Sequence, residues 1–172
     1  MTPKEIMAKF ANLLEQFEPI DRKPSDTDLT QIRDVVAPPL LQIPYDKTGA
    51  VHNLIGLILP EAAYTTHYGA EFLESTRVGA YYATIEDDAT AVVHARTETA
   101  YKANRAERAT YETARRETAQ FILAVAEDTW VRELQDTETL YTEVAPKALL
   151  APLQAGCTGR HDLDLLELHN EM

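Results

Sequence analysis

The sequence has little of what catalytic and metal-binding motifs require. Its single cysteine, Cys157, excludes an intrachain disulfide framework and a multi-cysteine zinc site. Its six glycines form neither the G-x-G-x-x-G nor the G-x-x-x-x-G-K phosphate-binding pattern, and the nucleophile motif G-x-S-x-G is missing. The motifs Glu-x-x-His and His-Glu-x-x-His, which are found in helical metal sites, do not occur in the sequence. We therefore expect neither an enzyme nor a cofactor.

Long apolar runs are also missing. No stretch approaches the roughly 18 apolar residues that a membrane-spanning helix needs. The N-terminus reads Met-Thr-Pro-Lys-Glu and lacks the apolar segment of a signal peptide. The sequence therefore predicts a cytoplasmic protein without a membrane partner.

Positive charge is scarce, and the formal net charge is −12. Such an acidic surface repels phosphate backbones, which disfavours direct nucleic-acid binding over a whole face. The stretch from His94 to Glu117 is the only mildly positive region, with six basic and four acidic side chains. Residues 127–172 are the most acidic part, with ten acidic and three basic side chains.

The N-terminal half carries several short helical patterns. Thr2-Pro3-Lys4-Glu5 is a capping-box pattern with proline at the first helical position, and Ser25-Asp26-Thr27-Asp28 starts a second helix that we expect to end at Pro38-Pro39. Short helices and connectors are expected from Leu40 to Tyr82, including one over Glu61 to Tyr68. The apolar run Leu54 to Leu59 fits a short strand as well as a helix, and its helical neighbours favour helix.

A long helix is expected over about residues 85–134. This segment contains no proline or glycine and is rich in alanine, glutamate and arginine, which are strong helix formers. Its length would exceed the width of a compact domain, so part of it must bend, pack against a partner or project. Its last part is strongly apolar and is expected to be buried, with Trp130 in the core. The core or assembly candidates from this part are Phe121, Ile122, Val125, Trp130 and Leu134.

The C-terminal part is expected to contain further short helices. Asp136 to Thr139 reads as a turn, followed by a short helix through Leu140 and Tyr141. A helix over Pro146 to Leu153, a break at Gly156 and Gly159, and a last helix from His161 to Met172 complete the pattern. Further core or assembly candidates here are Tyr141, Leu149, Leu150 and Leu153.

These patterns predict an all-α fold, a multi-helix bundle with one long helix and short flanking helices. An N-terminal region of short helices, residues 1–82, and a second region, residues 83–172, are expected to pack as one unit. The final amphipathic helix has no C-cap signal, so the second region is expected to be truncated at its C-terminus.

Three weaker constellations have a structural and a functional interpretation. Cys157-x-x-x-His161, with Asp162 and Asp164, could form half of a zinc site, but a helix start is favoured. The acidic group Glu86-Asp87-Asp88 fits a helix N-terminus better than a cation site. A third group could contact RNA phosphates, although interleaved glutamates favour a solvated, salt-bridged face. Its members are Arg105, Arg108, Arg115 and Arg116.

An ordered series of short strings resembles the Gag polyproteins of copia-type LTR retrotransposons, particularly the forms found in diatoms and related algae. The resemblance covers most of the chain, and its strings are structural rather than catalytic. Among them are Leu41-Gln42-Ile43-Pro44-Tyr45-Asp46, His52-Asn53-Leu54-Ile55-Gly56-Leu57-Ile58, Asp128-x-Trp130-Val131-x-x-Leu134 and Asp136-Thr137-Glu138-Thr139-Leu140-Tyr141-Thr142.

The resemblance implies a helical capsid subunit that associates with itself into a shell around the RNA of the element. Gag normally carries a basic RNA-binding tail, often with a zinc knuckle of three cysteines and one histidine, whereas this chain is acidic and has one cysteine. RNA binding is therefore expected only indirectly, through a region beyond Met172. Two alternatives stay open: a helical adaptor that binds a basic protein through its acidic C-terminal third, and a small helical-bundle enzyme.

Overall fold

The structure, a computed structural model, describes residues 1–45, 52–75 and 90–157 of the chain. The predicted all-α class is confirmed, because helices dominate these residues and the strands among them form one two-stranded antiparallel pair. Residues 146–157 are also helical. The other elements are α1 (Pro3–Leu14), α2 (Asp26–Leu41), β1 (Pro44–Tyr45), β2 (His52–Asn53), the 3₁₀ helix η1 (Leu54–Leu57), α3 (Glu61–Tyr68), α4 (Ala91–Val125), α5 (Asp128–Val131) and the 3₁₀ helix η3 (Arg132–Leu134).

The first two helices begin at the predicted capping boxes. The Thr2 backbone N–H donates to Glu5 Oε2 at 2.7 Å, and the Ser25 backbone N–H donates to Asp28 Oδ2 at 2.8 Å. Each box satisfies backbone N–H groups that the first turn of a helix leaves without an intrahelical partner. The N-termini of α1 and α2 are therefore set by local sequence.

The predicted end of α2 at Pro38-Pro39 is wrong. The helix includes both prolines and continues to Leu41. Proline removes a backbone donor, and here the loss falls in the last turn of the helix. Pro39 and Leu40 are both buried, and we infer that their packing in the core offsets the missing hydrogen bonds.

The long helix α4 ends earlier than predicted. It runs from Ala91 to Val125, and the expected residues 85–89 lie outside the described part of the chain. At Ala126 the backbone becomes extended, with ψ of 139°, although no proline or glycine is present. The Ile20 N–H donates to the Val125 carbonyl at 2.8 Å, so a segment distant in sequence pairs with the chain where the helix ends.

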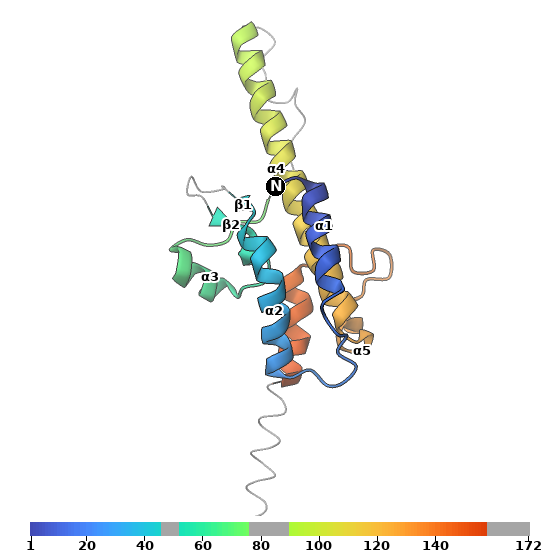
Figure 1. The fold of residues 1–172 in the computed structure, drawn as a ribbon. Helices are drawn as coiled ribbons and strands as arrows, with labels where there is room; N and C mark the ends of the chain where they lie inside the picture. Colours follow the sequence, from blue (N-terminus) through green and yellow to red (C-terminus); the bar gives the residue numbers. More distant parts are fainter. Residues whose placement is uncertain (46–51, 76–89, 158–172) are drawn as a thin grey trace, which may run out of the picture.

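One hydrophobic core joins the N-terminal helices to the second half of α4. Figure 1 shows α1 lying along α4, and the helix over 146–157 lying beside α2. The rings of Phe17 and Phe121 meet edge to face, with centroids 5.6 Å apart. The core thus contains side chains from both predicted regions, 1–82 and 83–172.

Other local predictions had mixed outcomes. The apolar run after Asn53 is helical, as η1, and α3 has the predicted bounds. The turn at Asp136 is confirmed, but the short helix through Leu140 and Tyr141 is not, because Asp136 and Leu140 instead form a bridge of two backbone hydrogen bonds. Gly156 lies within a helix rather than at a break. The predicted helix over 161–172, Gly159 and the acidic group 86–88 lie outside the described residues.

Candidate functional site

The core or assembly candidates divide into two groups by exposure. Phe121, Ile122, Val125 and the three leucines of the helix over 146–157 are at most 3% exposed. Trp130, Leu134 and Tyr141 are half-buried at the edge of this core. Side chains without exposed surface stabilise the folded chain itself and cannot contact a second chain while it stays folded. Any contact with a second chain would therefore have to come from other residues.

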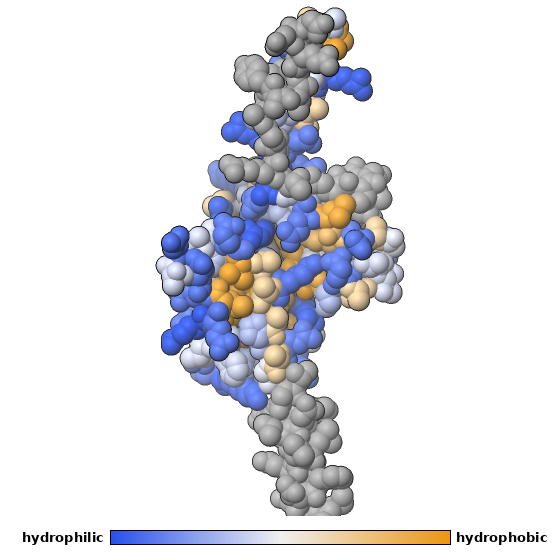
Figure 2. Space-filling model, turned by 180° about the vertical axis from the view of Figure 1, so that it is seen from behind, coloured by the Kyte–Doolittle hydropathy of each residue, from blue (hydrophilic) through white to orange (hydrophobic). Residues whose placement is uncertain are grey.

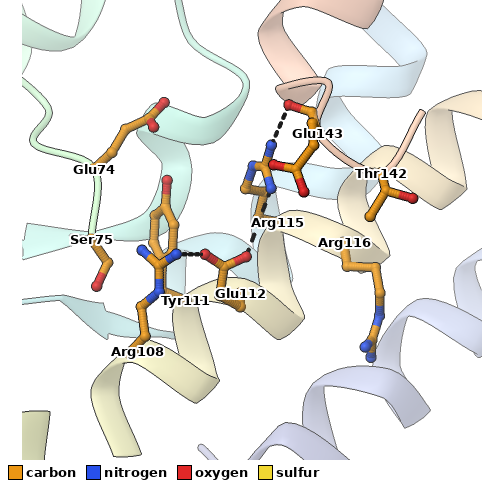
Figure 3. Close-up of a pocket in the computed structure, with 9 residues that line it drawn as sticks. All are labelled: Glu74, Ser75, Arg108, Tyr111, Glu112, Arg115, Arg116, Thr142 and Glu143. Atoms are coloured by element: carbon orange, nitrogen blue, oxygen red, sulfur yellow. Dashed lines mark hydrogen bonds and ion pairs between the residues drawn. The ribbon is translucent and has the colours of Figure 1, made fainter. Parts of the chain in front are cut away.

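Three of the four arginine candidates line one surface pocket. The pocket has a volume of about 530 Å³ and lies where the second half of α4 faces residues 74–75 and 142–143 (Figure 3). Arg105 is exposed and does not line it. The lining residues are Glu74, Ser75, Arg108, Tyr111, Glu112, Arg115, Arg116, Thr142 and Glu143.

Ion pairs offset much of the positive charge of this pocket. Glu112 pairs with Arg108 and also approaches Arg115, with 3.7 Å between the charged atoms. Arg115 Nη2 donates to the Glu143 carbonyl at 2.7 Å, and Arg116 pairs with Glu117 at 3.0 Å. Figure 3 shows Glu112 between Arg108 and Arg115. The arrangement is the salt-bridged face that the interleaved glutamates favour, and it leaves little unpaired charge for an anion.

Tyr111, which is not among the site residues predicted from the sequence, forms the buried wall of the pocket. It is 2% exposed, its ring stacks on Tyr45 with centroids 5.7 Å apart, and its hydroxyl has no hydrogen-bond partner among the described residues. Burial, and secondarily the charge of Glu74, raises the pKa of Tyr111 to about 12. The phenol therefore stays protonated at neutral pH and is a poor general base.

Cys157, the cysteine of the hypothetical half zinc site, is buried in the described part of the chain. Its Sγ lies 3.2 Å from the Leu153 carbonyl and 3.4 Å from the Pro24 carbonyl, both hydrogen-bond acceptors. Burial raises the pKa of the thiol, which disfavours the thiolate that metal binding requires. His161, Asp162 and Asp164 lie outside the described residues. Within those residues, no three His, Cys, Asp or Glu side chains gather as a metal site would need.

The first part of α4 is largely exposed. Residues 91–106, which we call the arm, extend past the other described helices (Figure 1). Only Thr97 and Tyr101 in the arm are half-buried, and its other side chains are exposed. Val92 is 76% exposed and Val93 is 46% exposed, and Figure 2 shows hydrophobic surface at this tip. Of the three outcomes expected from the length of this helix, which were bending, packing against a partner and projecting, the arm shows the third.

No protein-family model, curated protein or solved structure matches this chain. The described helices include none that is both long enough and apolar enough to cross a membrane.

Proposed function

We propose that this chain is a structural subunit that associates with itself, as a Gag-like capsid protein does, and that it carries out no catalysis. The observation that supports the proposal best is the arm. Sixteen residues of helix extend past the packed body, and fourteen of their side chains are exposed. An isolated helix of this length is marginal in water, so a second molecule would stabilise it by packing against it.

The dimensions of α4 also support a role in assembly. Its 35 residues span about 52 Å. A compact domain of 172 residues, the length of the whole chain, is about 40 Å across. Val92 and Val93, near the start of α4, are exposed apolar side chains that a second chain could cover. The Gag resemblance of the sequence leads to the same proposal.

The test is the mass of the full chain by light scattering across a concentration series, with negative-stain microscopy of the same samples. We expect the mass to grow with concentration and microscopy to show sheets, filaments or shells. A strict monomer at the highest concentration reached would contradict the proposal.

The second candidate is an adaptor that binds a basic protein partner. Its support is the acidic surface of residues 127–143, which carry six acidic side chains and one basic side chain. Salt-sensitive binding of a basic protein by a chain that remains monomeric would favour this function over self-association.

A further inference from the structure

The surface pocket beside the second half of α4 is lined by equal numbers of positive and negative side chains. The charged lining residues are Arg108, Arg115, Arg116, Glu74, Glu112 and Glu143. Their charges cancel, which disfavours a ligand with a large net charge of either sign. The volume of about 530 Å³ lies within the roughly 300–1,000 Å³ of small-molecule sites. The pocket therefore suits a small polar ligand whose own charges also balance.

Two side chains of this pocket have donors without an acceptor. The Tyr111 hydroxyl is buried, has no hydrogen-bond partner among the described residues, and is turned toward Glu74 in Figure 3. Arg115 Nη2 donates to the Glu143 carbonyl at 2.7 Å, whereas its Nη1 lies 3.7 Å from Glu112, which is beyond hydrogen-bond distance. A guanidinium has five N–H donors, so Arg115 retains donors for an acceptor that enters the pocket. Buried donors seldom remain without an acceptor in folded proteins.

Two carboxylates of the same pocket are available to a cation. Glu74 and Glu143 lie on different sides of Arg115 (Figure 3), and both are exposed. Within the described part of the chain, neither carboxylate forms an ion pair or a hydrogen bond. Glu112 differs from them, because it pairs with Arg108 and approaches Arg115. The pocket thus offers both unused donors and unpaired negative charge.

We propose that this pocket binds a small zwitterion of the size of a free amino acid or a dipeptide. The carboxylate of the ligand accepts from Arg115 and Tyr111, and its ammonium group faces Glu74 and Glu143. The site is complete within one copy of the chain, so the inference goes beyond the proposed self-association and does not depend on it. A simple anion is less favoured, because Glu112 already offsets the charge of two of the arginines.

The test is the binding of glycylglycine to the full chain, measured by saturation-transfer difference NMR. This experiment observes the probe, so it applies to single copies and to assemblies alike. N-acetylglycine lacks the ammonium group and glycinamide lacks the carboxylate. Each should bind about tenfold more weakly than glycylglycine, because each loses one charged contact.

Variants of the chain then locate the bound probe. E74Q/E143Q removes both unpaired carboxylates and should weaken glycylglycine binding by about tenfold. Y111F removes only the hydroxyl and should weaken binding by about threefold to tenfold. E133Q/E138Q makes the same charge change at exposed positions that do not line the pocket, and it should bind as the unmodified chain does. Circular dichroism of each variant verifies that the helices are retained.

Three results would overturn the proposal. The first is an absence of saturation transfer to glycylglycine. The second is equal binding of N-acetylglycine or of glycinamide, which would show a simple anion site or a simple cation site. The third is unchanged binding in both E74Q/E143Q and Y111F, which would place the probe outside this pocket. None of these results bears on self-association, which light scattering measures separately.

Discussion

At the scale of single residues, Gly56 leaves room for an aromatic cluster. A Cβ added there would overlap the ring of Phe72 and would lie 2.9 Å from the Cβ of Phe72. That ring packs against Tyr45 and Tyr64, with centroid distances of 5.7 Å and 5.2 Å. The absence of a side chain at Gly56 is thus what lets the segment after α3 pack onto η1.

Gly56→Ala is therefore expected to lower the free energy of unfolding by about 1–3 kcal/mol, as overpacking in a core does. The measurement is urea denaturation, with Phe72→Ala as the second member of a double-mutant cycle. Because Phe72→Ala removes the ring that clashes, Gly56→Ala should cost less in that background. An equal cost in both backgrounds would show that the clash is not the cause.

Asp28 is the buried carboxylate of the second capping box. It is 5% exposed, and its oxygens accept from Arg22 at 2.7 Å and 2.9 Å and from the Ser25 hydroxyl at 2.6 Å. The hydrogen bonds from Arg22, followed by those from Ser25, hold the pKa of Asp28 below its ordinary value of 3.8. The folded state therefore favours the ionised carboxylate.

This shift makes stability depend on pH in one direction. A depressed pKa contributes stability that is fully present above 3.8 and is lost as the pH falls through the lower pKa of the folded state. Asp28→Asn should cost about 2 kcal/mol at neutral pH and should reduce the loss of stability in acid. Asp26→Asn, at an exposed position in the same turn, should cost about 0.5 kcal/mol. An unchanged acid dependence in Asp28→Asn would contradict this role.

At the scale of elements, α4 consists of two parts that are stabilised by different interactions. From Tyr111 to Val125 one face is buried against α1 and the core, whereas most side chains of the arm are exposed. Alanine is frequent in the arm, and the pair of Glu98 with Lys102 spans one turn, so both favour helix locally. The two parts should therefore respond differently to the same substitution.

Proline tests this division. Ala100→Pro, at an exposed position of the arm, should reduce helix content by circular dichroism and leave the denaturation midpoint of the body unchanged. Ala114→Pro, at a fully buried position, should cost about 3 kcal/mol or more. The same Ala100→Pro variant should also lose self-association if the arm is a contact surface. A midpoint lowered equally by both variants would show that the arm belongs to the cooperative core.

At the scale of the whole molecule, charge acts on association in two opposite ways. A net charge of −12 makes copies repel one another, and salt weakens that repulsion. An attractive contact between oppositely charged surfaces of two copies would be weakened by salt as well. Salt dependence alone thus does not separate the two effects, whereas paired charge reversals do, because only a specific contact is restored by exchanging the signs.

The sequence by itself determined the features that arise within about one helical turn. Neighbouring residues determine the capping boxes at Thr2 and Ser25 and the bounds of α3. They also determine that the long segment is helical and that Arg108 pairs with Glu112. Caps, propensities and pairs four residues apart act through contacts that the order of residues already specifies. This is why the fold class and the salt-bridged face of α4 could be predicted.

Tertiary structure decided where distant segments meet. The end of α4 depends on the hydrogen bond from Ile20, and the pocket wall depends on the stacking of Tyr111 against Tyr45. The continuation of α2 through its prolines depends on the burial of Leu40 in the core. Ile20 and Val125 are distant in sequence, and so are Tyr45 and Tyr111, so no local pattern encodes these contacts. The sequence required that part of the long helix bend, pack or project, but only packing decided that residues 91–106 form the projecting part.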